Sequence, residues 1–274
     1  MGLLPRSQGH SGGPGVASAG GGRLLAGEVV SVALVTGGGG GIGRATAVAL
    51  ARDGADVAIA DLDSSLGEET ARLVEAAGRR ALFLRTDVAD GAQVAACVDR
   101  VERQLGPITA FVNNAGIEGV VAPIHLYPDD VFDRLLQVNT KGVFLGLKHV
   151  LARMIPRGAG AVVNTASTSS IRGRAGLAGY VATKHAVLGL TRVAALDVAG
   201  TAIRVNAVLP GPVETRMIES LDEQARRSGG IRRAGAAGYG KPEDIADVIA
   251  FLLSDKAKHV NGAAWTVDSG TTIA

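Results

Sequence analysis

Three side chains of the sequence could together perform general acid/base chemistry. Tyr180 and Lys184 lie four residues apart in GYVATKH, so both would project from one face of a helix. A lysine ammonium beside a phenol favours the phenolate and lowers a tyrosine pKa that starts at about 10, which suits tyrosine to proton transfer. Ser167 follows the apolar run GAVVNTA and would stand at the carboxyl end of a strand, where open α/β sheets bind ligands. A Tyr–Lys pair alone is common on helices, and the addition of Ser167 favours a catalytic site.

A run of glycines could bind the phosphates of a dinucleotide. The sequence TGGGGGIG at 36–43 follows an expected strand and opens an expected helix. Glycine lets backbone N–H groups approach a pyrophosphate, and the helix N-terminus adds free N–H donors and partial positive charge. A glycine-rich string could be only a flexible turn, but its position between strand and helix favours a dinucleotide site. The contacts are expected from Gly37, Gly41, Ile42 and Gly43.

Two aspartates that follow the next expected strands could contact the adenosine part of such a dinucleotide. Asp61 ends the second strand, where a carboxylate accepts hydrogen bonds from both ribose hydroxyls and repels a 2′-phosphate. The residue before Gly41 and the residue after Asp61 are uncharged, so NAD is predicted rather than NADP. Asp87, with Val88 beside it, is expected near the adenine. Asp61 could alternatively be a turn residue, and Asp87 the N-cap of the next helix.

These residues need strands and helices to position them. The expected strands are 29–36, 55–61, 80–87, 109–116, 160–167, 201–208 and 263–268. Helical spacing of apolar residues lies between them, at 42–53, 65–77, 94–105, 131–154, 178–198 and 242–253. Strands that alternate with helices imply parallel βαβ units, and nearly continuous apolar strands imply helices on both faces. We therefore predict an α/β fold with one doubly wound (Rossmann) seven-stranded parallel sheet, in a single domain over residues 27–274.

Composition excludes several classes of protein. The chain has 274 residues with 28 basic and 26 acidic side chains, and only 3% are aromatic, so no nucleic-acid partner is expected. No mainly apolar stretch of about 18 residues suggests a membrane span. Cys97 is the one cysteine, which rules out an internal disulfide and a multi-cysteine metal site and fits the reducing cytoplasm. No metal site is predicted.

The first 26 residues differ in composition from the rest of the chain. Glycine, serine and proline dominate there, and no hydrophobic periodicity appears. Such a segment cannot offset the entropy of ordering by burying apolar surface, so a disordered tail is expected. Its two leucines at 3–4 are followed at once by proline and arginine, unlike the continuous apolar region of a secretory signal.

Together these residues and their spacing resemble the motifs of the short-chain dehydrogenase/reductase family. The resemblance covers about residues 28–272 and rests on TGxxxGIG at 36–43, NNAG at 113–116, Asn139, Ser167, YxxxK at 180–184 and PG at 210–211. It implies an NAD-dependent oxidoreductase that interconverts a small secondary alcohol and its ketone. The stretches 114–119, 142–147 and 162–167 also resemble reductases of cyclic ketones.

The resemblance implies a role for each of these residues. Tyr180 would be the general acid/base, Ser167 would orient the substrate oxygen, and Lys184 would lower the tyrosine pKa and bind the nicotinamide ribose. Asn139 would hold a water in a proton relay that ends at Lys184. Without the resemblance, the sequence favours an Asn139 side chain that lies inside a helix and bonds to the local backbone. Further cofactor contacts are implied for Asn113, Ala115, Gly116, Pro210, Gly211, Val213 and Thr215. A homotetramer is also implied, with helices around 130–155 and 178–198 at its interfaces.

Other features leave the substrate open. Arg172 and Arg174 precede Tyr180 in an expected loop and could hold an anionic group or simply be solvated, and Glu118 is similarly placed. The stretch 214–240, rich in charge and glycine, is expected to form either a mobile lid or a plain surface excursion. Two alternative functions are an NADPH-linked 3-oxoacyl-carrier-protein reductase and a non-catalytic dinucleotide-sensing protein.

Overall fold

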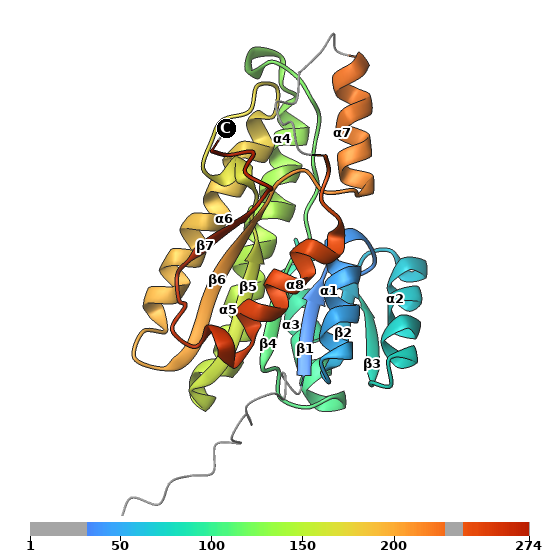
Figure 1. The fold of residues 1–274 in the computed structure, drawn as a ribbon, viewed down its shortest axis with the longest axis vertical. Helices are drawn as coiled ribbons and strands as arrows, with labels where there is room; N and C mark the ends of the chain where they lie inside the picture. Colours follow the sequence, from blue (N-terminus) through green and yellow to red (C-terminus); the bar gives the residue numbers. More distant parts are fainter. Residues whose placement is uncertain (1–31, 228–237, 274) are drawn as a thin grey trace, which may run out of the picture.

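The computed structural model of the chain describes residues 32–227 and 238–273. The tail predicted over 1–26 and the first residues of the predicted strand 29–36 lie outside the described residues. Seven parallel strands form one sheet in the order β3-β2-β1-β4-β5-β6-β7 (Figure 1). They are β1 (Val32–Thr36), β2 (Asp56–Asp61), β3 (Ala81–Arg85), β4 (Ala110–Asn113), β5 (Ala159–Thr165), β6 (Ala202–Pro210) and β7 (Ala264–Val267). The predicted seven-stranded parallel sheet is confirmed.

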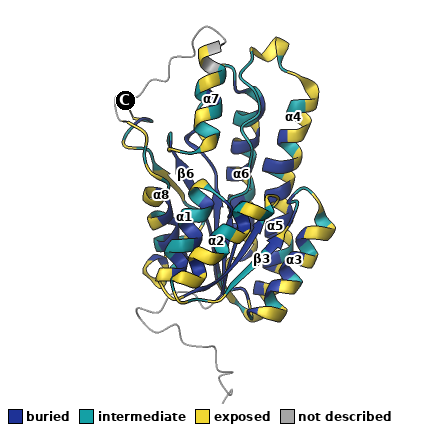
Figure 2. Ribbon diagram, turned by 90° about the vertical axis from the view of Figure 1, so that its right-hand side faces the viewer, coloured by how far each residue is buried: buried dark blue, intermediate teal, exposed yellow. Residues whose placement is uncertain are grey.

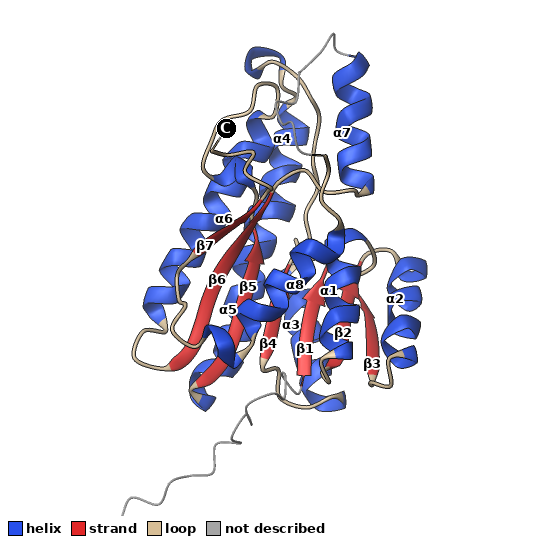
Figure 3. Ribbon diagram, viewed as in Figure 1, coloured by secondary structure: helices blue, strands red, loops and turns tan. Residues whose placement is uncertain are grey.

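Helices cover both faces of this sheet, as the doubly wound prediction requires (Figure 3). The described α-helices are α1 (Gly41–Arg52), α2 (Ser64–Ala76), α3 (Gly91–Gln104), α4 (Asp129–Leu135), α5 (Gly142–Met154), α6 (Ala178–Asp197), α7 (Arg216–Arg227) and α8 (Pro242–Leu253). Buried residues of α1 and α8, such as Leu50 and Ile249, pack on one face. Residues of α3, α5 and α6, such as Val98 and Val187, pack on the other. Figure 2 shows the buried strands between helices whose outer surfaces are exposed.

Strand β1 illustrates why the strands read as continuous apolar runs. Val32 and Leu34 belong to the core on one face, whereas Ala33 and Val35 belong to the core on the other. Successive side chains of a strand point to opposite faces of the sheet. Because helices cover both faces, every position of the strand is buried and must be apolar or paired.

The chain changes direction across the sheet between β1 and β4. Strand β1 pairs with β2 on one side and with β4 on the other, and ligands bind outside the carboxyl ends of parallel strands at such a point. The two strand ends are tied together. Thr36 Oγ1 accepts hydrogen bonds from the backbone N–H groups of Asn114, at 2.9 Å, and Ala115, at 3.2 Å. In return, Asn114 Nδ2 donates to the carbonyl oxygens of Thr36 and Gly37, both at 3.1 Å.

The helical structure predicted over 131–154 is present, but it contains a π-helical segment. The structure divides this stretch into α4, a π-helical segment η2 (Leu136–Lys141) and α5. The side chain of Asn139, in η2, makes two hydrogen bonds of 2.8 Å with the backbone of Ile117. A π-helical turn often marks a functional position within a longer helix. Buried apolar residues continue through all three pieces, so the periodicity does not reveal the change.

Candidate active site

A cavity of about 960 Å³ lies at the carboxyl ends of the strands. Its walls come from segments 40–42, 60–62, 86–88, 114–118, 165–169, 172–175, 210–213 and 215–218, together with single residues of other elements. The predicted site residues that line it are Gly37, Gly41, Ile42, Asp61, Asp87, Val88, Ala115, Gly116, Ser167, Tyr180, Lys184, Pro210, Gly211, Val213 and Thr215. One cavity therefore brings together the glycine turn and the Tyr–Lys–Ser group.

The glycine turn has room for phosphates because side chains are missing from it. Gly37 and Gly41 have φ values of 62° and 50°, in the left-handed region that favours glycine. A Cβ on Gly37 would lie 2.7 Å from Ala115 Cα, so no larger residue fits there. Helix α1 begins at Gly41 with no side-chain cap and no acidic residue in its first turn, which leaves its N–H groups and partial positive charge free. These features fit a pyrophosphate.

Gly43 lies behind this turn rather than in the cavity wall. A Cβ on Gly43 would come within 2.1 Å of Gly37 O and 2.7 Å of Asn114 Nδ2. Its missing side chain lets α1 pack closely against the turn. Gly43 therefore shapes the turn through packing, and the direct contact expected from it stays a prediction.

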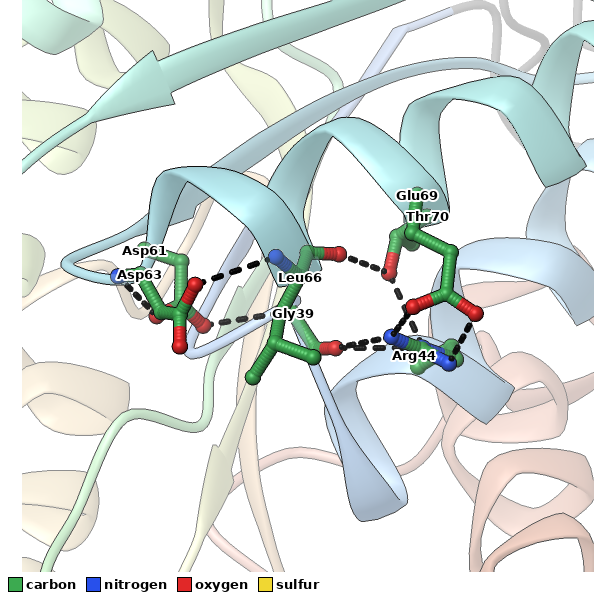
Figure 4. Close-up of polar contacts among 7 residues, drawn as sticks. All are labelled: Gly39, Arg44, Asp61, Asp63, Leu66, Glu69 and Thr70. Carbon is green, nitrogen blue, oxygen red and sulfur yellow. Dashed lines mark hydrogen bonds and ion pairs between the residues drawn. The ribbon is translucent and has the colours of Figure 1, made fainter.

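Asp61 supports the glycine turn from the end of β2 (Figure 4). Its Oδ2 accepts a hydrogen bond of 2.8 Å from Gly39 N, and its Oδ1 accepts one of 3.0 Å from Asp63 N. Asp63, not Asp61, caps α2 by accepting from Leu66 N at 3.1 Å. Asp61 thus adds an anionic group to the cavity wall beside the turn.

Two arginines lie near the same turn but differ in their contacts. Arg44 donates to Gly39 O and forms an ion pair of 2.8 Å with Glu69, as Figure 4 shows, and it is not part of the cavity wall. Arg216, the first residue of α7, does line the cavity, and its Nη2 lies 3.5 Å from where a Gly40 Cβ would be. The residues next to Gly41 and Asp61 in the sequence do not reveal Arg216, because it lies more than a hundred residues further along the chain.

Asp87 and Val88 line the cavity beyond β3. The carboxylate of Asp87 accepts a hydrogen bond of 2.9 Å from Ala89 N. The N-cap of α3 is Asp90, which accepts from Ala92 N and Gln93 N. The alternative that Asp87 caps this helix is therefore wrong, and its place in the cavity wall remains.

The acid/base candidates occupy adjoining walls, at the end of β5 and the start of α6. Lys184 Nζ donates a hydrogen bond of 2.8 Å to Thr165 O and lies 5.7 Å from the centre of the Tyr180 ring. Burial lowers the pKa of Lys184 to about 8, so the ammonium is still mainly protonated at neutral pH. Ser167 is 8% exposed and its Oγ accepts from Ser169 N at 3.1 Å. A cation, a phenol and a hydroxyl thus share one site.

Asn139 is buried next to this group without entering the cavity wall. Besides its two bonds to Ile117, its Nδ2 donates to Thr183 Oγ1 at 3.2 Å. A Cβ on Gly116 would lie 3.2 Å from Asn139 Oδ1 and 3.7 Å from Lys184 Nζ, so both side chains lie close to Gly116. The alternative of a bond to local backbone is wrong, because Ile117 is 22 residues away in the chain.

The two asparagines at the end of β4 have different contacts. Asn113 Nδ2 donates to Val143 O of α5 at 2.9 Å, and the residue is 2% exposed. It therefore stabilises the packing of α5 on the sheet and is not part of the cavity wall, and the cofactor contact expected from it stays a prediction. Asn114 is the asparagine in the cavity wall. Its side chain holds β1 and β4 together.

The segment after β6 forms the wall next to the glycine turn. Gly211 N donates to Val267 O at 2.9 Å, and a Cβ on Gly211 would lie 2.7 Å from Asp268 Cβ. Thr215 Cγ2 lies 3.0 Å from where a Gly41 Cβ would be. Residues 228–237 of the predicted lid lie outside the described residues, whereas α7 is a helix beyond the carboxyl ends of the strands, at the top of Figure 1.

The C-terminal turn beside this wall contains an unusual backbone conformation. Ser269 has a φ of 50°, and it is the one non-glycine residue with positive φ in the part of the chain that is described. Asp268 holds the turn, since its carboxylate accepts from Gly270 N and Thr272 N. A left-handed serine is strained relative to glycine.

Within 32–227 and 238–273, no helix has both the length and the apolar character needed to cross a bilayer. In the same ranges, no three histidine, cysteine or acidic side chains are grouped so that they could hold a metal ion.

Known proteins match this chain over most of its length. A family model described as "Enoyl-(Acyl carrier protein) reductase" matches residues 37–272. Levodione reductase of Leifsonia aquatica is 42% identical over 252 residues, which are 89% of this chain and 94% of that protein. Cis-4-hydroxycyclohexanecarboxylate dehydrogenase of Sinomonas cyclohexanicum is 41% identical over 88% of this chain and 96% of its own length. The structure of NAD⁺-bound xylitol dehydrogenase matches with a TM-score of 0.85 and 36% identity, covering 88% of this chain and 98% of that one.

Proposed function

Since the chain belongs to the short-chain dehydrogenase/reductase family, we propose that it interconverts a secondary alcohol on a ring and the corresponding ketone, with NAD as the hydride carrier. The chain is an oxidoreductase that acts on CH–OH groups with a nicotinamide dinucleotide. The observation that carries the proposal is the shared cavity, in which Ser167, Tyr180 and Lys184 face the same space as the glycine turn.

The proton transfer follows from the placement of these side chains. In the oxidation, Tyr180 Oη takes the proton of the substrate hydroxyl, and in the reduction it returns the proton to the ketone oxygen. Ser167 Oγ holds the same oxygen by a hydrogen bond. The buried ammonium of Lys184 favours the phenolate of Tyr180 by its charge. A bound nicotinamide dinucleotide supplies the hydride acceptor for the alcohol carbon.

The residues that would hold the dinucleotide follow the cavity wall. Gly37, Gly41 and Ile42 offer backbone to the pyrophosphate at the start of α1, and Asp61 accepts from the adenosine ribose. Contacts beyond these come from Asp87, Val88, Ala115, Gly116, Lys184, Pro210, Gly211, Val213 and Thr215. Asn139 binds the backbone of Ile117, next to Gly116. The proposal includes a water held by Asn139 in a proton relay that ends at Lys184.

NAD rather than NADP is supported by the charge beside the turn. The carboxylate of Asp61 would face a 2′-phosphate and repel it. Arg216 lies beside Gly40 and forms no ion pair with Asp61 among the described residues, and we propose that its charge serves the bridging phosphates. The similar xylitol dehydrogenase structure is likewise that of an NAD⁺-bound protein.

A ring alcohol is supported by the names of two relatives. Levodione and 4-hydroxycyclohexanecarboxylate both name small cyclic substrates. Apolar side chains in the cavity wall, such as Val121, Leu177 and Leu221, could pack against a ring. One of the names contains a carboxylate and the other does not, so the names alone leave the charge of the substrate open.

Two other functions are less well supported. The description of the family model favours an acyl-carrier-protein substrate, but Asp61 disfavours the NADPH such a reductase would use. A dinucleotide sensor would have no need for an assembled acid/base group, yet Tyr180, Lys184 and Ser167 stand together.

A tyrosine substitution tests the reaction. Tyr180→Phe is expected to lower cyclohexanol oxidation by at least about 100-fold, while NADH binding, followed by its fluorescence, stays unchanged. Tyr127→Phe is the matched control, because the Tyr127 hydroxyl is buried outside the cavity wall. Retained turnover in Tyr180→Phe would contradict the acid/base role. A wild-type protein that binds NADH but oxidises no alcohol would favour the sensor.

We also propose a cytoplasmic homotetramer in which residues 27–274 carry the activity and the first 26 are dispensable. Exposed apolar side chains on α5 and α6 support the assembly: Phe144 is 48%, Val193 57% and Leu196 75% exposed. Light scattering that finds only monomer at micromolar concentration would contradict it. Deletion of residues 1–26 is expected to leave kcat and KM unchanged.

A further inference from the structure

The half of the cavity beyond the acid/base group has an uneven distribution of charge. Its walls carry the guanidinium groups of Arg134, Arg172 and Arg174, and the carboxylate of Glu118 is the one acidic side chain there among the described residues. The two other carboxylates of the wall, Asp61 and Asp87, lie at the ends of β2 and β3, on the dinucleotide side. The alcohol side therefore has an excess of positive charge.

Two of these arginines are held in place rather than freely solvated. Arg172 Nη1 donates to Thr271 O at 2.7 Å, and its Nε is buried without a hydrogen-bond partner in the described chain. Arg174 Nη2 donates to Thr168 Oγ1 at 3.3 Å. Thr168 directly follows Ser167 in the chain, and Ser167, Thr168 and Arg174 all line the cavity. A buried donor without a partner costs free energy, which an incoming acceptor would recover.

Among the described residues, ion pairs leave the charges of Arg134 and Arg172 without a carboxylate partner. Within the described residues, neither Arg134 nor Arg172 forms a salt bridge, whereas arginines elsewhere, such as Arg44 and Arg157, pair with glutamates. Cations that line a cavity without bound carboxylates attract an anionic ligand. A guanidinium matches the planar geometry of a carboxylate and can bind it through two hydrogen bonds.

Apolar side chains also line this half of the cavity. Ile117, Val121, Leu177, Met217 and Leu221 contribute to its wall. Such a chamber suits the hydrocarbon body of a ligand, whereas the guanidinium groups suit a charged end.

We propose that the substrate is a hydroxy acid whose hydrocarbon body packs against the apolar wall and whose carboxylate binds Arg172 and Arg174. The inference rests on the proposed function, because the carboxylate must share the cavity with the hydroxyl that Ser167 and Tyr180 engage. The inference specifies the chemical class of the substrate. The acid/base group contacts only the hydroxyl, so it does not distinguish charged alcohols from neutral ones.

A binding experiment tests the charge preference independently of turnover. Calorimetry on the NADH-loaded protein would compare cyclohexanecarboxylate with cyclohexanecarboxamide, which has nearly the same shape and no charge. The carboxylate is expected to bind at least about tenfold more tightly, as a charge-assisted hydrogen bond to a guanidinium would give. In Arg172→Gln and in Arg174→Gln this ratio should fall at least about fivefold, with carboxamide binding unchanged. Arg72→Gln removes an exposed charge on α2, outside the cavity wall, and should leave the ratio as it was.

The outcomes separate this inference from the proposed function. Equal binding of both compounds by the wild type, or an unchanged ratio in both cavity variants, would overturn the hydroxy-acid inference. Oxidation of cyclohexanol by the same protein would then leave the proposed function intact. Tight carboxylate binding that depends on the two arginines, without oxidation of any alcohol, would support the anion site and reject the proposed reaction. Arg174→Gln stays informative even if Arg172→Gln weakens folding through its lost bond to Thr271.

Discussion

The ammonium of Lys184 donates a 2.8 Å hydrogen bond to the carbonyl oxygen of Thr165 and thereby joins the start of α6 to the end of β5. The bond holds a positive charge at a buried position in the cavity wall. One hydrogen bond to a neutral acceptor does not replace the lost hydration, which is why the pKa of the lysine falls. The same cation lies 5.7 Å from the centre of the Tyr180 ring.

The lowered pKa of Lys184 predicts how stability depends on pH. In the folded state it is about 8, against 10.5 in the unfolded chain, so between these values the unfolded state holds more protons. The free energy of unfolding should therefore rise with pH in this window, by up to about 3 kcal/mol. Urea unfolding of the wild type and of Lys184→Met between pH 7.5 and 10.5 measures the difference. Parallel curves for the two proteins would show that the lysine pKa is not lowered.

Asp61 is predicted to set the preference between the two dinucleotides. Asp61→Ser removes the charge that repels a 2′-phosphate, so kcat/KM with NADP should rise by about tenfold or more while that with NAD falls. Asp63→Asn is the control, since Asp63 caps α2 and does not line the cavity. The measurement is kcat/KM with each dinucleotide. A wild-type enzyme that already prefers NADP would refute the role given to Asp61.

Arg216 is predicted to bind the bridging phosphates. Because it is exposed, Arg216→Gln should weaken NADH binding only about fivefold, since solvent screens the charge. ADP-ribose binding should weaken equally and adenosine binding not at all, because only the first two ligands carry a pyrophosphate. Arg226→Gln removes an exposed charge from the same helix, outside the cavity wall. An equal effect of both substitutions on NADH would mean that only the overall charge of α7 matters.

The left-handed conformation of Ser269 predicts a stabilising substitution. Glycine adopts a φ of 50° without the steric cost that a serine Cβ incurs. Ser269→Gly should raise the free energy of unfolding by about 1 kcal/mol, measured in urea. Ser269→Ala keeps the Cβ and should bring no such gain. An equal gain in the alanine variant would trace the effect to the hydroxyl instead.

Much of the fold was predictable from local patterns. The strand β2 and the helices α6 and α8 lie within a residue or so of their expected bounds. A strand buried on both faces gives a continuous apolar run, and a helix buried on one face gives apolar residues at a period of about 3.6, so both patterns can be recognised in the sequence. The placement of Ser167, Tyr180 and Lys184 in one cavity was also predicted, since each follows or begins an element at the carboxyl edge of the sheet.

The missed features depend on contacts between distant parts of the chain. The bond of Asn139 to Ile117 determines its role, and the periodicity of its own helix carries no information about that partner. Asn113 and Asn114 are adjacent and chemically identical. They are told apart only by the strand pleat, which turns one toward α5 and the other toward β1. Arg216 reaches the glycine turn because α7 begins beside it.

The pairing of β1 with β4 also has a consequence for how the chain folds. Thr36 and the backbone of Asn114, which it holds, are 78 residues apart, and α1, β2, α2, β3 and α3 lie between them. Contacts of such separation cost loop entropy before they stabilise anything, so they form slowly. On a ribosome, the glycine turn emerges long before the strand that completes its wall. The nascent chain therefore acquires its nucleotide-binding crevice only after the first half of the sheet has been synthesised.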